Sequence, residues 1–349
     1  MIVVNGRFLS QRITGIQRFA YEICCALHQI GVDIRILAPA NIEKDYNLDG
    51  LTIEVIGGKG SHYWEQVTLP AYMKRHYNGE YLLSLSGLSP LWYNRNIMTI
   101  HDISYLLRPR SYSLPYCLYY QFMTPLIAGR AQQILTVSEF SKTELVQRLG
   151  LPAEKIEVVY NAVRPSPLLP RGNNKEKYLL AVGSHVPRKN VRRVLEAYCR
   201  IENPDFELYV VGGKNAVYAD AGLRPYTTRK GIRFLGYVTG QELTRLYRNA
   251  TAYINASLYE GFGIPIVEAM GQECAVVVSD IPAFREVSGD AALYFDPMNV
   301  ADICDKMETI MQSEKTREQL VTKGNERVKL FSWKSSAMKV QEIFKKLKE

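Results

Sequence analysis

One stretch of the chain places two carboxylates close to small residues. It reads Glu260-Gly-Phe-Gly-Ile-Pro-Ile-Val-Glu268. Glycines let a backbone approach a ligand closely, and Pro265 suits the first turn of a helix, where its missing N–H group loses no partner. The N–H groups at such a helix start bind hydroxyl or phosphate oxygens. We predict that Glu260 lies before this helix and Glu268 in its first turn, and that both grip sugar hydroxyls. A glycine-rich turn with a capping glutamate is the alternative.

Two adjacent cations form a second candidate site. Arg188 and Lys189 stand between a predicted strand at 178–182 and a predicted helix at 191–201. The helix dipole disfavours cations at the N-terminal end, so a functional reason for them is attractive. Fixed cations and helix N-termini can neutralise a diphosphate leaving group without a metal ion. This pair therefore predicts diphosphate binding, against the alternative of a merely basic helix start.

A histidine and an aspartate stand at the end of a predicted strand at 96–101. Ligands of parallel sheets collect at the carboxyl ends of the strands, where His101 and Asp102 are expected. Histidine titrates near neutral pH and can donate or accept a hydrogen bond. His101 is therefore a candidate for substrate contact, and a strand-end histidine held by a backbone carbonyl is the alternative.

Four further positions are weaker candidates. Gly15 precedes a predicted helix at 16–30, and the absence of a G-x-G-x-x-G string argues against a dinucleotide-dependent dehydrogenase. Ser138 and Asn161 follow predicted strands, although an asparagine there is commonly a turn residue. Glu286 follows an Asp-Ile-Pro loop and could simply cap a helix.

The elements that must position these residues alternate between short apolar runs and longer amphipathic ones. Such alternation predicts crossover units and mainly parallel sheets that are covered on both faces. Strands are predicted at 2–5, 33–38, 52–56, 81–85, 96–101, 133–137, 156–160, 178–182, 207–211, 232–235, 252–255, 275–279 and 292–295. Helices are predicted at 16–30, 65–76, 115–131, 139–149, 191–201, 240–249, 265–272, 300–312, 315–329 and 333–348.

The alternation is interrupted once, which predicts an α/β chain of two Rossmann-like, doubly wound domains facing each other across a cleft. Three prolines and a polar tail occupy 164–174, which we interpret as a linker between domains at 1–163 and 175–331. The last helix, at 333–348 with Ser332 as its N-cap, is expected to pack back on the N-terminal domain. Ligands are expected in the cleft, beyond the carboxyl ends of the strands.

The composition is that of an ordinary folded protein, since 47% of the 349 residues are hydrophobic and 22% are charged. No apolar run approaches the roughly 20 residues of a membrane span, and the N-terminus lacks the pattern of a secretory signal. We therefore expect a cytoplasmic protein. Its six cysteines form no C-x-x-C pair, which favours buried free thiols over a disulfide framework or a zinc site.

The net charge of +8 is compatible with nucleic acid, an anionic membrane surface or phosphorylated substrates as partners. The chain has neither a block of basic residues nor the spacing of a DNA-binding motif, so nucleic acid is the weakest of these. A stretch at 105–127 is rich in aromatic residues and is flanked by Arg108, Arg110 and Arg130. Contact with a lipid-linked acceptor or with the inner face of the cell membrane would suit this pattern, and a helix packed on the core is the alternative.

Together these motifs resemble those of the retaining glycosyltransferases of family 4, which have the GT-B fold. The string from Glu260 to Glu268 resembles the E-x7-E signature of that family. Further similar stretches cover almost the whole chain, at 13–18, 99–102, 136–142, 160–161, 181–190, 280–286 and 290–297. Each motif alone is weak, whereas their order and spacing together are specific.

The resemblance implies transfer of a sugar from a nucleoside diphosphate sugar to a hydroxyl, with retention of configuration and without a metal or other cofactor. Arg188 and Lys189 would stabilise the diphosphate, Glu260 would hold the sugar hydroxyls, and His101 would position the sugar. In the family an arginine often follows the strand glycine, but here Ser184 stands there and Arg188 is the candidate replacement. Glu268 would hold the ribose. The implied donor-binding residues are Gly15, Gly183, Ser184, Arg188, Lys189, Gly261, Phe262, Gly263, Ile264 and Glu268.

The chain is also similar to bacterial enzymes that build O-antigen, capsule or exopolysaccharide. This implies a glycan or lipid-linked glycan as acceptor and a donor such as GDP-mannose. One alternative is a sugar-nucleotide epimerase of the same fold. The E-x7-E string is not typical of such epimerases. A second alternative is a non-catalytic protein that binds a nucleotide sugar, but the chain keeps both glutamates, the lysine and the histidine, which argues against it. A third is a nucleic-acid-binding protein.

Overall fold

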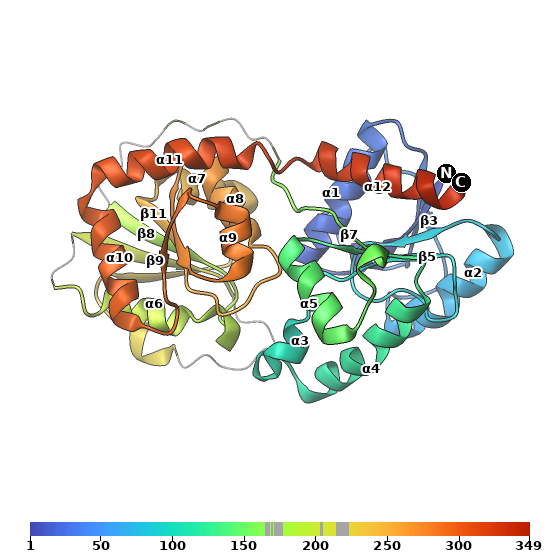
Figure 1. The fold of residues 1–349 in the computed structure, drawn as a ribbon, viewed down its shortest axis with the longest axis horizontal. Coiled ribbons are helices and arrows are strands. Elements are labelled where there is room, and N and C mark those ends of the chain that lie inside the picture. The colour runs from blue at the N-terminus through green and yellow to red at the C-terminus, as the bar shows by residue number, and fades with distance from the viewer. Residues whose placement is uncertain (165–167, 169, 171–176, 203–204, 214–222) are drawn as a thin grey trace. The chain divides into compact units, whose positions relative to one another are not determined.

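A computed structural model describes residues 1–164, 168, 170, 177–202, 205–213 and 223–349, and the chain forms two compact units (Figure 1). Unit 1 comprises Met1–Ile103, Leu118–Ala162 and Ser332–Glu349, and unit 2 comprises Ser104–Cys117 and Val163–Phe331. Each contains one parallel sheet. Of the linker predicted at 164–174, only residues 164, 168 and 170 are among those described.

Unit 1 contains a seven-stranded sheet of order β3-β2-β1-β4-β5-β6-β7. Its strands are β1 Ile2–Asn5, β2 Ile34–Ala38, β3 Ile53–Val55, β4 Leu82–Ser84, β5 Asn96–Thr99, β6 Gln133–Thr136 and β7 Ile156–Val158. Its main helices are α1 Gly15–Gln29, α2 Leu69–His76, α4 Leu114–Arg130, which begins in unit 2, α5 Glu139–Leu149 and α12 Trp333–Lys348. Figure 1 shows α1 and α12 above this sheet and α2, α4 and α5 below it.

Unit 2 contains a six-stranded sheet of order β10-β9-β8-β11-β12-β13. Its strands are β8 Lys177–Val182, β9 Phe206–Val211, β10 Ile232–Gly236, β11 Ala252–Asn255, β12 Ala275–Ser279 and β13 Ala292–Phe295. Its helices are α3 Ser104–Leu107, α6 Val191–Tyr198, α7 Gly240–Asn249, α8 Ile264–Gly271, α9 Pro282–Ser288, α10 Val300–Gln312 and α11 Glu314–Val328.

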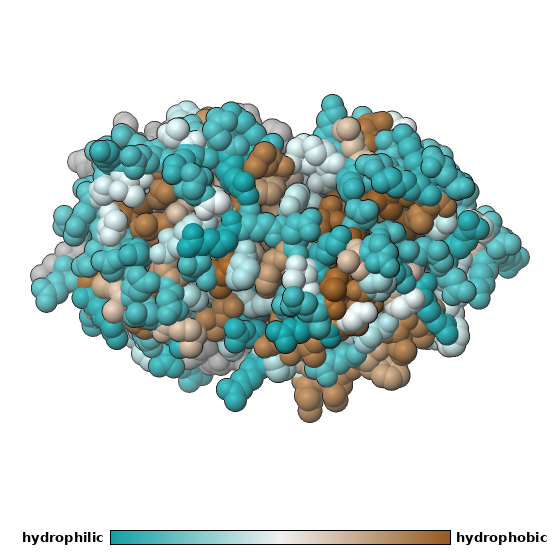
Figure 2. Space-filling model, in the orientation of Figure 1, coloured by the Kyte–Doolittle hydropathy of each residue, from teal (hydrophilic) through white to brown (hydrophobic). Residues whose placement is uncertain are grey.

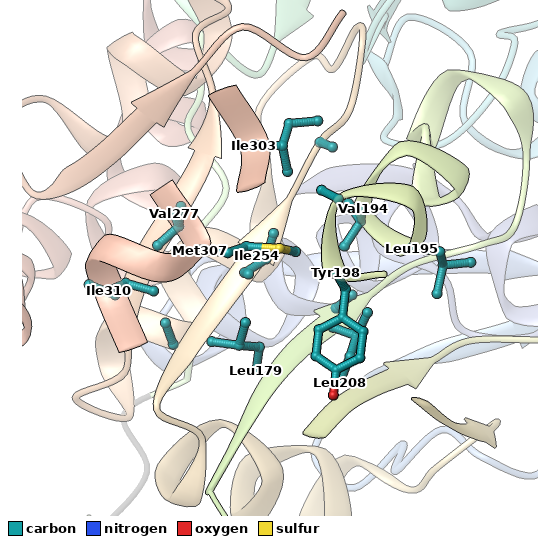
Figure 3. Packing of buried hydrophobic residues seen from close by; sticks show 14 of the residues in the cluster. Leu179, Val194, Leu195, Tyr198, Leu208, Ile254, Val277, Ile303, Met307 and Ile310 are labelled. Carbon is teal, nitrogen blue, oxygen red and sulfur yellow. The ribbon is translucent and has the colours of Figure 1, made fainter. Parts of the chain in front are cut away.

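The strands form where the sequence has short, almost continuous apolar runs. Such runs suit a parallel sheet, because helices bury both of its faces. Figure 3 shows the result in unit 2, where Leu179, Ile254 and Val277 of the sheet meet side chains of α6 and α10. In unit 1, Trp64 and Met73 pack with the apolar side chains of β1, β2 and β4.

Each predicted strand and helix lies where an element is observed, with ends that differ by a few residues. The predicted helix at 65–76 is divided, since its first part is a π-helix, Trp64–Thr68. The structure adds α3 and α9, which hold four and seven residues. Elements of that length give too few turns to show a helical period in the sequence.

Two segments belong to a unit whose other residues lie far from them in the sequence, namely α12 in unit 1 and Ser104–Cys117 in unit 2. In α12 the Trp333 ring meets the Phe19 ring of α1 with centroids 6.0 Å apart, and the Tyr81 hydroxyl donates to the Leu347 carbonyl at 2.9 Å. Ser332 caps this helix, as the sequence predicts. The segment Ser104–Cys117 belongs to unit 2, although it lies within the range predicted for the N-terminal domain.

Each sheet has one point where the strand order reverses. In unit 1 this switch point lies between β1 and β4, and in unit 2 between β8 and β11. Ligands of open parallel sheets bind beyond the carboxyl ends of the strands at such points. No helix within the described part of the chain is long and apolar enough to cross a membrane.

Candidate active site

The carboxylate of Glu260 is the centre of a charged cluster in unit 2. Glu260 follows β11 and is 8% exposed. Its Oε1 accepts hydrogen bonds from the Lys189 ammonium and, at 2.7 Å, from the Ser257 hydroxyl. Its Oε2 lies 3.2 Å from Nη1 of Arg188. Lys189 and Glu260 are 71 positions apart in the sequence. They and Arg188 nevertheless meet at the switch point between β8 and β11.

The charges of this cluster determine its protonation. Burial by itself raises the pKa of Glu260, but Lys189 and Arg188 outweigh it and lower that pKa to about 2. Glu260 is thus a carboxylate at neutral pH, able to accept hydrogen bonds and unable to donate a proton. Two cations beside one carboxylate leave one positive charge in excess, which favours an anionic ligand.

An unusual turn presents Arg188 and Lys189 to Glu260. The 3-10 turn Pro187–Lys189 ends at Asn190, which has a φ of 54°. Asparagine tolerates this left-handed conformation better than most residues do. The buried Asn190 amide donates to the carbonyls of Ala256 at 3.0 Å and Pro297 at 2.8 Å. These bonds fix the turn to the loop that carries Glu260.

The same turn is tied to the segment Ser104–Cys117. The backbone N–H of Arg188 donates to the Ser111 hydroxyl at 3.2 Å, and the backbone N–H of Leu258 donates to the Arg188 carbonyl at 2.8 Å. Arg188 is therefore held through its backbone as well as its side chain. Its side chain is 12% exposed, so it is packed rather than solvated.

Glycines bring two backbone segments close to this cluster. Gly263, the N-cap of α8, has a φ of 109°, and a Cβ there would lie 2.8 Å from the Phe284 ring. Gly183 has a φ of 153° and lies beside the side chain of Lys189. A side chain at either position would strain the backbone, and at Gly263 it would also clash. Pro265 lies in the first turn of α8, as the sequence predicts.

Glu268 does not lie where the sequence places it. Helix α8 begins at Ile264, so Glu268 falls beyond the first turn, and the first-turn prediction is wrong. Its carboxylate is half-buried and accepts a hydrogen bond from the Tyr247 hydroxyl at 3.3 Å. An interaction of Glu268 with the N-terminal dipole of the helix is therefore not what positions it.

His101 lies two residues beyond the end of β5 in unit 1. Its Nε2 is 2.9 Å from the Leu85 carbonyl, so Nε2 carries the proton that is donated. Its ring meets the edge of Phe19 at a centroid distance of 5.0 Å. Burial lowers the pKa of His101, against the opposing effects of the Leu85 carbonyl and Asp102. The imidazole is thus neutral at pH 7, with Nδ1 as an acceptor.

The weaker candidates are spread over both units. Ser138 is the N-cap of α5, where its hydroxyl accepts a hydrogen bond from the Ser141 N–H at 2.9 Å. Asn161 is 3% exposed. Glu286 lies inside α9, whose N-cap is Ile281, so the suggestion that it caps a helix is wrong. Gly15 is the first residue of α1. Ser184, Gly261 and Phe262 lie in the loops that follow β8 and β11.

Unit 1 contains a charged cluster that the sequence interpretation missed. Glu65, in the π-helix, is fully buried, and its Oε2 lies 2.5 Å from Nη1 of Arg7. Its Oε1 accepts from the Asn5 amide at 3.0 Å, and that amide also donates to Ser84 at 3.2 Å. Asn5 and Ser84 end β1 and β4, so this cluster lies at the switch point of unit 1.

The protonation of Glu65 differs from that of Glu260. Burial raises the pKa of Glu65 to about 7, although Arg7 and Asn5 act in the opposite direction. The nearby His62 imidazole has a pKa lowered to about 4 by burial and by Arg7. A polar residue ending β1, followed two residues later by Arg7, is the sequence signal that could have indicated this cluster.

Comparison with known proteins identifies both halves of the chain. The family described as Glycosyltransferase Family 4 matches residues 13–166, and the family described as Glycosyl transferases group 1 matches residues 170–327. O-antigen chain mannosyltransferase B of Escherichia coli is 33% identical over 270 residues, which cover 72% of this chain and 71% of that protein. O-antigen chain mannosyltransferase RfbU of Salmonella typhimurium is 28% identical over 312 residues, which cover 85% of this chain and 87% of that protein.

Solved structures share the fold. Sucrose-phosphate synthase from Thermosynechococcus elongatus superposes with a TM-score of 0.79 at 16% identity, over 99% of this chain and 98% of that one. Anabaena HepE, in complex with UDP-glucose, gives 0.76 at 14% identity over 99% of both chains. These likenesses establish the GT-B fold of two Rossmann-like units. With the two family matches and the 33% identical relative, they show that the chain belongs to the glycosyltransferases that join a Family 4 domain to a group 1 domain.

Proposed function

We propose that this glycosyltransferase moves a hexose from a nucleoside diphosphate sugar to a hydroxyl of a glycan or lipid-linked glycan, with retention of configuration. The similarity to O-antigen mannosyltransferases supports mannose as the sugar and O-antigen assembly, a part of lipopolysaccharide synthesis, as the process. GDP-mannose is the donor that we propose first. UDP-sugars are the second candidates, because the structural neighbour HepE was solved with UDP-glucose.

One observation supports this proposal most strongly, namely the meeting of Arg188, Lys189 and Glu260 at the switch point of unit 2. Cleavage of a glycosyl–phosphate bond releases a diphosphate whose negative charge grows as the bond breaks. Fixed cations with an excess positive charge stabilise that leaving group, and they are already in place before the reaction. This arrangement would need no metal ion, and we propose that the reaction requires none.

The ionised Glu260 carboxylate suits recognition of sugar hydroxyls, because it can only accept hydrogen bonds. Donor binding would bring the diphosphate to Lys189 and Arg188 and redirect these side chains from Glu260 toward the ligand. The carboxylate would then accept from the sugar. We propose that Glu268 holds the ribose and that His101, through Nδ1 or its backbone, positions the sugar. In this reaction, leaving-group stabilisation and alignment replace a carboxylate nucleophile.

The location of the acceptor bears on where the protein works. A lipid-linked acceptor would place the enzyme at the inner face of the cell membrane. We propose a cytoplasmic protein that associates peripherally with an anionic membrane surface, and not with nucleic acid.

Thermal unfolding with a panel of nucleoside diphosphates and their sugars tests the donor assignment. A ligand that binds only the folded state stabilises it by mass action and so raises the unfolding temperature. At a ligand concentration of a hundred times the dissociation constant, the free energy of unfolding rises by about 2.7 kcal/mol. We expect GDP and GDP-mannose to give the largest shifts, and addition of EDTA to leave them unchanged. Release of GDP from GDP-mannose in the presence of an acceptor glycan would then establish transfer.

The Lys189→Ala variant tests whether the nucleotide binds at the assigned site, and Lys334→Ala is its control. Lys189→Ala should lose most of the shift with every nucleoside diphosphate, whereas Lys334→Ala, at an exposed position of α12, should keep it. A nucleotide shift that survives in Lys189→Ala would contradict the assigned diphosphate site. A shift with UDP-sugars alone would replace the donor and leave the site assignment intact.

A further inference from the structure

A closed ring of four hydrogen bonds joins the segment Ser104–Cys117 to both loops of the charged cluster. The backbone N–H of Arg188 donates to the Ser111 hydroxyl at 3.2 Å, and the backbone N–H of Ser111 donates to the Arg108 carbonyl at 2.9 Å. Nη2 of Arg108 donates to the Leu258 carbonyl at 3.4 Å, and the backbone N–H of Leu258 donates to the Arg188 carbonyl at 2.8 Å. We call these four bonds the Ser111 ring, which lies wholly within unit 2.

The Ser111 hydroxyl is the contact of this ring that water is least able to replace. Ser111 is 1% exposed, and the Arg188 side chain is 12% exposed. A buried N–H group that has no acceptor is costly, so this hydroxyl fixes the backbone of Arg188. Arg108, by contrast, is exposed, and its bond of 3.4 Å is long. We therefore expect Ser111 to contribute more to the ring than Arg108 does.

The Ser111 ring and Asn190 hold the turn Pro187–Lys189 at different points. Asn190 ties the C-terminal end of the turn to two backbone carbonyls, whereas Ser111 holds its middle residue, Arg188. Two separate contacts restrict the orientation of a turn as well as its position. Loss of Ser111 alone should therefore leave the turn attached but less precisely oriented. This orientation matters because cations stabilise a diphosphate best when they are in place before the reaction.

We propose that Ser111, with a smaller contribution from Arg108, is a positioning residue of the diphosphate site. Both residues act through the turn, which they orient so that Arg188 and Lys189 face the diphosphate. The inference rests on the diphosphate site proposed above. It adds that this site depends on a segment that follows His101 closely in the sequence. One short piece of chain thus connects the cations for the leaving group with the histidine proposed to position the sugar.

The segment has internal packing that suits it as a support. The Ser104 side chain is hydrogen-bonded to the Tyr112 hydroxyl, and the rings of Tyr112 and Tyr116 stack with centroids 5.2 Å apart. Closer to α4 the chain is exposed at Ser113, and Figure 2 shows hydrophobic residues along the lower edge of the view, over α4. The part of the segment that bears Ser111 is therefore held by its own contacts, and Ser113 offers a matched serine outside the ring.

Titration calorimetry on the full chain tests the proposal through two ratios, the affinity for GDP relative to GMP and the affinity for UDP relative to UMP. The second phosphate is the group that Arg188 and Lys189 are proposed to bind, so the ratio reports how well these cations are placed. For the nucleotide that binds more tightly, Ser111→Ala should weaken diphosphate binding about fivefold, as for loss of one hydrogen bond. It should change monophosphate binding by less than about twofold. Arg108→Ala should weaken diphosphate binding by about twofold, because its bond is long and exposed.

Matched variants separate positioning from a general loosening of the fold. Ser113→Ala and Arg110→Ala change exposed neighbours of the same residue types and should bind both nucleotides like the wild type. The double variant Ser111→Ala/Arg188→Ala should weaken diphosphate binding by less than the product of the two single effects, because Ser111 acts through Arg188. If circular dichroism shows that Ser111→Ala does not fold, Arg108→Ala against Arg110→Ala decides by the same ratio.

The outcomes also separate this inference from the diphosphate site on which it rests. A lower ratio in Arg188→Ala with an unchanged ratio in Ser111→Ala overturns the positioning role alone. Equal weakening of monophosphate and diphosphate binding by Ser111→Ala overturns it too, since a structural defect would act on both. An unchanged ratio in Arg188→Ala rejects the diphosphate site itself, and the positioning role with it.

Discussion

The two units place a buried glutamate beside basic side chains at the same topological position, yet the two glutamates differ in charge. Glu260 in unit 2 faces Lys189 and Arg188, and its pKa falls to about 2. Glu65 in unit 1 faces Arg7 alone among the cations near it, and burial raises its pKa to about 7. Both clusters lie where the strand order of their sheets reverses.

The comparison shows that the sheet topology determines where each cluster lies, whereas the number of nearby cations determines whether its glutamate is ionised. One extra cation in unit 2 turns a buried carboxyl group into a stable carboxylate and leaves positive charge in excess. In unit 1 the charge of Arg7 is in excess when Glu65 is protonated and is balanced when Glu65 is ionised. Because the pKa of Glu65 is about 7, this cluster favours a diphosphate less than the cluster of unit 2 does at neutral pH. The following predictions test this difference, beginning with the largest expected effect.

Removing the charge of Glu260 should have the largest effect on activity. Glu260→Gln keeps the shape of the side chain, and we expect the rate of sugar transfer to fall by about a thousandfold or more, as for loss of a preorganised electrostatic contact. Binding of free nucleoside diphosphate should be retained or become tighter, because Lys189 and Arg188 lose their competing carboxylate. Turnover and nucleotide affinity are measured on the same preparation. A parallel loss of both would instead make Glu260 a nucleotide contact or a structural residue.

Removing one cation from the same cluster should have a smaller effect. Lys189→Ala should lower kcat by about a hundredfold, similar to loss of one oxyanion donor. Arg188 remains and supplies part of the stabilisation. Lys189→Arg should recover part of the rate, whereas Lys177→Ala, an exposed lysine of β8, should behave like the wild type. Near-wild-type turnover of Lys189→Ala would refute its role with the leaving group.

The pH dependence of stability should distinguish the two glutamates. The folded-state pKa of Glu65 lies above its ordinary value of 4.5, so between pH 5 and 6.5 the folded state binds more protons than the unfolded one. Stability should therefore fall as the pH rises, by about 2 kcal/mol over this window, and Glu65→Gln should lack this slope. For Glu260, whose pKa is lowered, stability is lost instead as the pH falls from about 4.5 toward 2. Urea unfolding at several pH values measures both, and parallel curves for wild type and Glu65→Gln would contradict the assignment.

The contact of Glu268 with Tyr247 should matter least. Tyr247→Phe removes one hydrogen bond of 3.3 Å to a half-buried carboxylate, so the free energy of unfolding should change by about 1 kcal/mol or less. The KM for the donor should rise by about fivefold or less, because Glu268 stays in place. A larger change in KM would show that this hydroxyl is required to aim Glu268 at the ribose.

The sequence predicts the order of strands and helices well, because the short apolar runs of parallel strands and the longer helical runs differ in period. It also indicates Arg188, Lys189 and Glu260 as site residues, through helix-start chemistry and the family resemblance. It does not predict their direct ion pairs, since a contact between positions 71 apart follows from strand order rather than from any local pattern. The sheet order alone brings β8 beside β11.

Glu65 shows the opposite limit. In the sequence it is a polar residue at the start of a predicted amphipathic helix, where a glutamate is ordinary and exposed. In the structure it lies in a π-helix, where its side chain is buried against Arg7 and Asn5. Glu268 was misplaced for a similar reason, because a shift of one residue in the helix start moves a side chain out of the first turn. Burial and register at element ends therefore limit such predictions more than fold class does.

The return of α12 to unit 1 has a consequence for synthesis on the ribosome. Unit 1 takes its last helix from residues 332–349, after the whole of unit 2 has emerged. Unit 1 therefore cannot complete its packing until Trp333 has been synthesised, and the side of α1 that carries Phe19 lacks this contact until then. Unit 2 can close first although its main part is translated second. Nascent chains stalled before Ser332 should accordingly recruit chaperones to the N-terminal half.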